Sequence, residues 1–152
     1  MVDKSKKLDD SYFMREAIND AKINDHRFGA IIVKDSEIIA KSGKRSKSDA
    51  RFHAETNAIL NASKNLTGCT LYSTCEPCPM CFYMAWVTGV SRLVYGATIN
   101  DSIDAGLPEI KITAEELNKC GDNKIKIEGN FLRNECLELL KETYKKTINL
   151  KV

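Results

Sequence analysis

The sequence predicts an α/β domain in which helices are layered on one mixed β-sheet. Short runs rich in β-branched residues alternate along the chain with segments whose apolar residues recur at helical spacing. This alternation is typical of α/β folds. The 152 residues contain no internal repeat, low-complexity tract or Pro/Gly-rich linker, so we expect residues 1–152 to form a single domain.

The first half of the chain is expected to contain a helix, a hairpin and a second helix. Apolar side chains at i, i+3, i+4 and i+7 define the first helix, which Ser11 is expected to cap and which ends near Ile23. Two apolar runs around a polar turn predict the hairpin. The predicted elements are a helix at 11–23, strands at 28–33 and 38–40 joined by a turn at 35–37, and a helix at 53–64.

The second half continues the alternation. Pro79 suits the first position of a helix, where its missing N–H would be unpaired in any case. The segment Thr98–Pro108 has the composition of a loop, and Asn130 is expected to cap a closing helix. The remaining predicted elements are a strand at 69–73, a helix at 79–87, a strand at 92–96, a short helix at 114–119 and a strand at 125–128.

The composition excludes several classes of protein. Hydrophobic and charged contents of 43% and 29% are ordinary for a globular domain, and no apolar run approaches the roughly 18 residues of a membrane span. The start, Met1–Lys7, is charged, so we expect a cytoplasmic protein with neither a signal peptide nor a membrane anchor. A net charge of +2 is too small to indicate nucleic-acid binding by itself. In a reducing compartment the six cysteines should be thiols, with Cys69, Cys120 and Cys136 buried.

A metal site is predicted from two motifs. Pro77–Cys81 places Cys78 and Cys81 at i and i+3 on a helix start, where both sulfurs can reach one metal about 2.3 Å away. His53 can supply a nitrogen. A zinc ion with three protein ligands keeps a fourth position for water, whereas a structural zinc normally has four Cys or His ligands. The sequence therefore predicts a catalytic Zn²⁺ held by His53, Cys78 and Cys81.

Glu55 is predicted to be the catalytic acid and base. It follows His53 by two residues, roughly 200° round a helix, so it should lie beside the water rather than in the ligand set. H-x-E followed by P-C-x-x-C is the signature of zinc deaminases, and both halves are present here. In that chemistry hydroxide attacks an amine-bearing ring carbon, while the glutamate protonates the ring nitrogen and then the leaving amine.

These motifs resemble those of the cytidine deaminase superfamily, and within it the branch of guanine deaminases and tRNA adenosine deaminases. Thr74–Cys81 is similar to the guanine deaminases, and Asn134–Leu140 is similar to the tRNA enzymes. The resemblance covers nearly the whole chain. It implies a three-layer α/β/α sandwich around one five-stranded mixed sheet, the zinc ligands and proton shuttle named above, and a homodimer.

The resemblance also implies a substrate, a small-molecule nucleobase or nucleoside of the guanine type. Ala105–Glu109 keeps the Ala-Gly and the acid of guanine deaminases, with Leu107 in place of an aromatic residue. Guanine presents an N1–H and an amino group side by side, which one carboxylate can accept together, whereas adenine has an acceptor at N1. We therefore expect Glu109, together with Phe28 and Ala54, to contact the substrate.

Departures from the family pattern leave other substrates open. Both subfamilies place an Asn in the loop before the His motif, and Ser42–Ser46 has none; their Asp-Pro-Thr-Ala becomes Asp49–Phe52. His53–Ile59 also resembles the deoxycytidylate deaminases. The alternatives are a tRNA adenosine deaminase, and then a deaminase of cytosine, cytidine or (deoxy)cytidylate.

A structural zinc-binding module is the alternative outside enzymes. It would need a fourth ligand, for which Cys75 or His26 could serve, but it gives Glu55 no role. A thioredoxin-like pair at Cys78 and Cys81 would leave the His53 motif unexplained.

A cluster of cations precedes the metal motif. A solvated loop is the simpler interpretation. Alternatively, Lys44, Arg45 and Lys47 meet a phosphate of a nucleotide or of tRNA, which would argue against a free base as substrate. The five cations are Lys41, Lys44, Arg45, Lys47 and Arg51.

Overall fold

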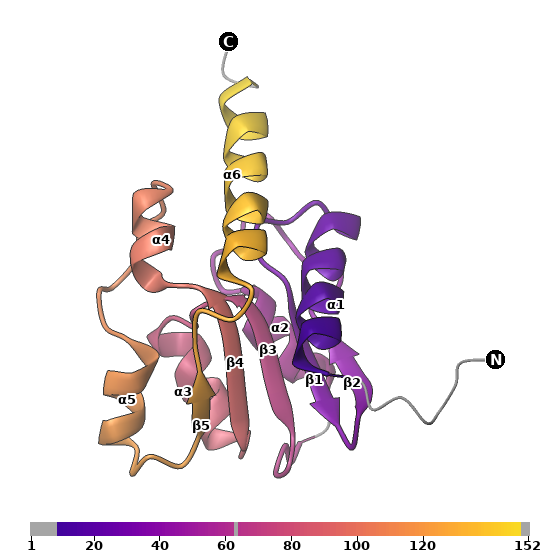
Figure 1. The fold of residues 1–152 in the computed structure, drawn as a ribbon, viewed down its shortest axis with the longest axis vertical. Helices are drawn as coiled ribbons and strands as arrows, with labels where there is room; N and C mark the ends of the chain where they lie inside the picture. Colours follow the sequence, from indigo (N-terminus) through magenta and orange to yellow (C-terminus); the bar gives the residue numbers. More distant parts are fainter. Residues whose placement is uncertain (1–8, 63, 150–152) are drawn as a thin grey trace, which may run out of the picture.

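The computed structural model describes residues 9–62 and 64–149 and contains a five-stranded mixed sheet with helices on both faces (Figure 1). The strand order is β2-β1-β3-β4-β5; β1 is antiparallel to β2 and β3, whereas β3, β4 and β5 are mutually parallel. The predicted three-layer sandwich is confirmed. The strands are β1 (Ala30–Lys34), β2 (Glu37–Lys41), β3 (Thr70–Cys75), β4 (Arg92–Ala97) and β5 (Lys126–Glu128).

The helices form the two outer layers. One face of the sheet carries α1 (Asp10–Ile23) and α6 (Arg133–Asn149). The other carries α2 (Ala54–Asn61), α3 (Pro79–Val87) and α5 (Ala114–Cys120), and α4 (Ile99–Asp104) lies beyond the end of β4 (Figure 1). None of the helices in the described residues has the length and apolar character to cross a membrane. The charged segment Met1–Lys7 lies outside the described residues.

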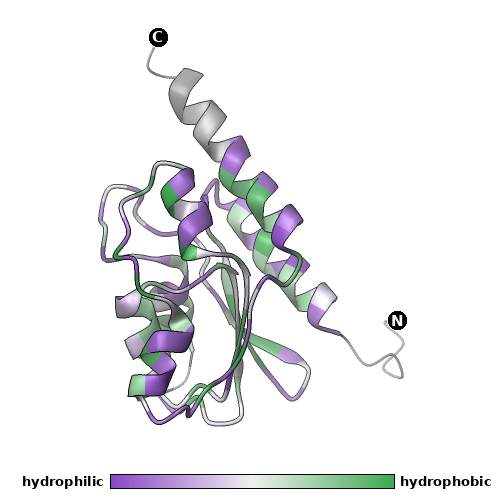
Figure 2. Ribbon diagram, turned by 60° about the vertical axis from the view of Figure 1, so that its left-hand side comes forward, coloured by the Kyte–Doolittle hydropathy of each residue, from purple (hydrophilic) through white to green (hydrophobic). Residues whose placement is uncertain are grey.

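Alternation along the strands builds two cores. Ile31 and Val94 face the core under α1 and α6, whereas Leu71 and Leu93 face the core under α2 and α3. Figure 2 shows hydrophobic and hydrophilic residues alternating round the helices, as expected when one side of each packs on the sheet. Each face of the sheet is therefore covered by its own apolar layer.

Several predicted boundaries are confirmed and others are wrong. The helix Pro79–Val87 is as predicted. The first helix ends at Ile23 as predicted, but Asp9 rather than Ser11 caps it, because the Asp9 side chain accepts the Tyr12 N–H at 3.0 Å. The strand expected from position 28 begins at Ala30, and the helix expected to reach position 64 ends at Asn61.

Three further predictions in the second half are corrected. The expected loop at 98–108 contains α4, whose Thr98 and Asp101 form a reciprocal capping box. Asn130 is not a cap, because its φ of 57° is left-handed whereas a cap is extended, and α6 begins at Arg133. Cys69 and Cys136 are buried as predicted, but Cys120 is exposed because it is the last residue of α5.

One buried carboxylate joins the end of β3 to two helices. Glu76 is 5% exposed, and its oxygens accept the N–H groups of Ile99 at 2.9 Å and Ala114 at 2.8 Å. These are the first residues of α4 and α5. The Glu76 N–H also donates to the carbonyl of Ala97 at 2.7 Å. The carboxylate therefore lies at the positive end of two helices and satisfies a free N–H of each.

We expect Glu76→Gln to lower the free energy of unfolding by about 2 kcal/mol, because the amide NH₂ would face one N–H donor and leave it unpaired. Urea denaturation measures the loss. The matched control is Glu128→Gln, which weakens an exposed ion pair with Arg92 and should cost less than about 1 kcal/mol. Equal losses in the two variants would contradict the role assigned to Glu76.

Candidate active site

A cavity of about 660 Å³ lies at the edge of the sheet where β3 and β4 end. The carboxyl ends of parallel strands meet at the same edge, so the segments that follow these two strands approach each other there. Because β1 is antiparallel to β3, the residues that precede β1 reach the same edge. Six residues predicted for the site line the cavity: Phe28, His53, Ala54, Glu55, Cys78 and Glu109.

The three predicted metal ligands come together. His53 and Cys78 are the N-cap residues of α2 and α3, and neither uses its side chain as a cap. The His53 Nδ1 is 3.5 Å from the Cys78 Sγ and 3.4 Å from the Cys81 Sγ, and the two sulfurs are 3.6 Å apart. Two helix N-termini therefore present one nitrogen and two sulfurs to a common point.

These distances fit a zinc ion. Ligands at 2.0–2.3 Å in tetrahedral directions would stand about 3.6 Å apart for nitrogen and sulfur and about 3.8 Å apart for the two sulfurs. Among the described residues, the group of potential ligands consists of His53, Cys78 and Cys81. Cys75 and His26, the conceivable fourth ligands, line the cavity but do not belong to the group. Three protein ligands are typical of a catalytic zinc, whereas a structural zinc has four.

The electrostatics of the group favour a cation. Hydrogen bonds from Cys81 and His53 lower the pKa of Cys78 to about 4, and the bond to Cys78 raises the pKa of His53. The bond to Cys78 and burial raise the pKa of Cys81. Cys78 is therefore the more acidic of the two thiols, and a metal ion that binds the group would displace the protons that its partners carry.

Glu55 lies in the first turn of α2 and is 5% exposed. Its Oε1 is 2.8 Å from the Ser73 Oγ, which is also 2.7 Å from the Cys75 carbonyl oxygen. The hydroxyl has one proton for two acceptors. When Ser73 donates to the carbonyl, Glu55 keeps its hydrogen bond only as a protonated acid, so both protonation states of Glu55 have a partner here.

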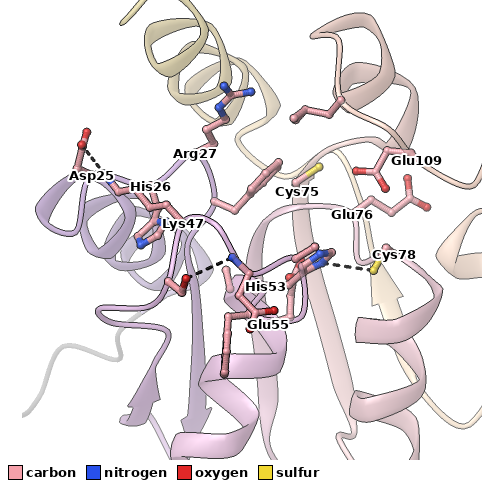
Figure 3. A pocket seen from close by; sticks show the side chains of 17 residues that line it. Asp25, His26, Arg27, Lys47, His53, Glu55, Cys75, Glu76, Cys78 and Glu109 are labelled. Carbon is pink, nitrogen blue, oxygen red and sulfur yellow. Dashed lines mark hydrogen bonds and ion pairs between the residues drawn. The ribbon is translucent and has the colours of Figure 1, made fainter. Parts of the chain in front are cut away.

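Glu109 reaches the cavity from the segment after α4 (Figure 3). Its Oε1 accepts the Ser102 hydroxyl at 2.8 Å, and no residue in the described part of the chain bonds its Oε2. Burial raises the pKa of the Glu109 carboxyl, and the Ser102 bond opposes that shift. Figure 3 shows Glu109 and Cys78 on one side of the cavity and Asp25, His26 and Lys47 on the other.

A family model for the cytidine and deoxycytidylate deaminase zinc-binding region matches residues 7–97, which include His53, Glu55, Cys78 and Cys81. The chain belongs to this deaminase family. It is 33% identical over 148 residues to the tRNA-specific adenosine deaminase of Buchnera aphidicola, which covers 90% of this chain and 94% of that protein. It is 38% identical over 95 residues to the guanine deaminase of Bacillus subtilis, which covers 58% of this chain and 61% of that protein.

The fold of this deaminase resembles that of a guanine deaminase from Nitrosomonas europaea with a TM-score of 0.76, over 92% of this chain and 87% of that structure, at 22% identity. The chain is therefore a zinc-dependent hydrolytic deaminase of a nucleobase or nucleoside.

The cations before the metal motif are mostly engaged within the deaminase. Lys41 pairs with Glu16, Lys47 with Asp25 and Arg51 with Asp49. The partly buried Arg45 donates to the Phe28 carbonyl at 2.7 Å, and burial lowers the pKa of its guanidinium. Of the five, Lys47 lines the cavity. These pairings favour the interpretation of a largely neutralised loop.

Three residues at or beside the cavity were not predicted from the sequence. Ser73 and Ser102 bond the two acids of the site, and Arg27 lines the cavity from the segment between α1 and β1. No local pattern marks the two serines, because their partners are 18 and 7 residues away and meet them only in the folded chain. Arg27 could have been predicted to line the cavity, because it immediately precedes Phe28, which the sequence assigns to the substrate site.

We expect purified wild-type deaminase to contain one zinc per chain, and His53→Ala, Cys78→Ala and Cys81→Ala each to lose most of it, because two ligands bind zinc far more weakly than three. Elemental analysis of the protein measures the content. Cys75→Ser is the matched control, since it changes a neighbouring thiol outside the group. Loss of zinc from the control would indicate a four-ligand structural site.

Proposed function

We propose that this deaminase removes the amino group of a guanine-type purine. The observation that carries the proposal is the Glu109 carboxylate, which lines the cavity together with His53 and Cys78 and has one oxygen free of protein partners among the described residues. Guanine presents N1–H and its 2-amino group on one edge, and the reacting carbon lies between them. A carboxylate that accepts from this edge orients that carbon and selects against adenine, whose N1 is an acceptor.

The roles of the other residues follow from their positions. His53, Cys78 and Cys81 hold the zinc, which when bound supplies a Lewis acid that makes water nucleophilic at neutral pH. Glu55 takes one proton from the attacking water and gives it to the ring nitrogen, then takes the second proton from the new hydroxyl and gives it to the amine as the C–N bond breaks and the carbonyl forms. Ser73 accepts or donates a hydrogen bond as Glu55 changes its protonation state. Ammonia and a xanthine-type product leave.

Phe28 and Ala54 complete the proposed substrate site. Ala54 is 1% exposed and lies between the first zinc ligand and the proton carrier, so its small side chain leaves room for a planar ring. Phe28 offers an apolar surface against which a ring can pack. The Arg45 bond to the Phe28 carbonyl fixes the backbone that carries this ring.

Location, domain organisation and assembly are part of the proposal. All six cysteines are free thiols, which supports a reducing cytoplasm, and residues 1–152 are assigned to one deaminase domain.

A homodimer is supported by α3, where Met80, Tyr83 and Val87 are 41%, 60% and 55% exposed. These residues recur at i, i+3 and i+7 and therefore lie on one face of the helix.

Deamination of adenosine in tRNA is the second candidate. The relative with that activity matches 90% of the chain, whereas the guanine deaminase of Bacillus subtilis matches 58%. Arg27 and Lys47 at the cavity rim could also approach a phosphate. The experiment that separates the candidates is ammonia release from guanine, guanosine, adenosine, cytidine, their monophosphates and tRNA, and we expect guanine or guanosine to react fastest.

We expect Glu109→Gln to lower kcat/KM for guanine by about 100-fold, because the amide NH₂ would oppose a donor of the guanine edge. Zinc content should stay at the wild-type value. Adenine or cytosine substrates should change far less, because they lack the pair of donors. Steady-state assays of ammonia release measure kcat/KM for each substrate, and elemental analysis measures the zinc content.

Glu55→Gln is the control for the chemistry. It should retain zinc and release no ammonia from any substrate, since the proton carrier is missing. Full guanine activity in Glu109→Ala, or none in the wild-type protein, would move the tRNA adenosine reaction to first place.

The loop cations provide a separate test of phosphate recognition. Replacing Lys44 and Lys47 with Ala should leave turnover of a free base or nucleoside within about twofold, because Lys44 does not line the cavity and Lys47 lies across it from Glu109. If the true substrate carries phosphate, the salt dependence of its binding should flatten by about one unit per lost contact. Arg45→Ala should differ from the two lysine variants and lower the turnover of every substrate, because Arg45 donates a hydrogen bond to the Phe28 carbonyl.

A further inference from the structure

Ser102 is a buried hydroxyl that the reaction described above does not use. It is 0% exposed, and its Oγ donates to the Glu109 Oε1 at 2.8 Å. The bond anchors one carboxylate oxygen and so restricts the orientations that the carboxylate can adopt. The second oxygen has no hydrogen-bond partner among the described residues, and Glu109 lines the cavity.

The helix that carries Ser102 is fixed at several points. Thr98 and Asp101 cap α4 reciprocally, and the Arg133 guanidinium binds both oxygens of Asp101 at 2.9 and 2.6 Å. The Glu76 carboxylate holds the first N–H of the same helix. Ser102 itself accepts the Leu107 N–H at its carbonyl oxygen, at 3.1 Å, and so ties down the segment that leads to Glu109.

We infer that Ser102 is a positioning residue that sets the orientation of the Glu109 carboxylate and thereby the preference for a base edge with two adjacent donors. The inference rests on the proposed role of Glu109 in binding guanine. A carboxylate on a loop would otherwise lose rotational freedom on binding the substrate, and a fixed acceptor avoids that cost. The hydroxyl also keeps the carboxylate an acceptor, because it donates a hydrogen bond to the ionised form.

Substitutions at Ser102 test the inference directly. We expect Ser102→Ala to lower kcat/KM for guanine about 10-fold, the effect of losing one hydrogen bond to a charged group. Ser102→Thr keeps the hydroxyl and should recover most of that loss. Zinc content and Tm should stay close to wild type. Ser91→Ala is the matched control, because the Ser91 Oγ accepts a hydrogen bond from the Gly68 N–H at the opposite end of β4.

A double-mutant cycle with Glu109→Ala distinguishes positioning from a general structural role. If Ser102 acts through Glu109, adding Ser102→Ala to Glu109→Ala should change kcat/KM by less than about twofold, so the two losses are not additive. Independent, multiplicative losses would overturn the inference. So would a failure of Ser102→Thr to recover activity while its zinc content and Tm are normal.

The cycle also separates this inference from the proposed function. If the wild-type protein does not deaminate guanine, the guanine proposal fails, and the same four proteins are then assayed with the substrate that reacts fastest. Non-additive losses on that substrate would support Ser102 as the residue that positions Glu109. Wild-type rates in Glu109→Ala and Ser102→Ala on that substrate would reject the inference as well.

Discussion

The fold around the cavity depends on one buried carboxylate, that of Glu76. It follows β3 directly, and its two oxygens bind the N-termini of α4 and α5 while its own N–H binds the end of β4. The next residues, Pro77 and Cys78, lead into the metal site. A single side chain thus links the segment that leads to Cys78 with the first residues of α4 and α5. Without it, two helix ends would be buried with unpaired donors.

The cavity therefore has two parts that are built in different ways. The zinc ligands and Glu55 lie within one turn of two helix N-termini, so short-range spacing sets the arrangement on each helix, and the packing of α2 against α3 brings the two helix ends together. Glu109 belongs to a segment with no strand or helix of its own, and its carboxylate accepts a hydrogen bond from Ser102 on the anchored α4. We assign hydrolysis, the reaction of the family, to the first part and the choice of base to the second. Variation in the second part can change the substrate without disturbing the chemistry.

The sequence predicts these two parts unequally well. Cys78 and Cys81 could be paired because a Pro at N1 and the i, i+3 spacing fix their directions locally. His53 and Glu55 could be added because H-x-E and P-C-x-x-C together form the zinc deaminase signature. The sheet was predictable because β-branched runs alternate with helical periodicity. The helix α4 was missed although Thr98 and Asp101 form a readable cap, because the polar composition of the segment outweighed that signal. The Ser102 and Arg45 contacts could not be predicted, since they join segments brought together only by folding.

The two outermost strands of the sheet have a consequence for behaviour at high concentration. An open sheet exposes unpaired N–H and C=O groups along both edges, which can template pairing with another chain. Here β5 has only three residues, with Lys126 and Glu128 exposed, and β2 exposes Glu37 and Lys41 at its ends. A short edge and charged edge positions discourage intermolecular strand addition, so the parallel core of the sheet is shielded from aggregation while its carboxyl-terminal end stays open to substrate.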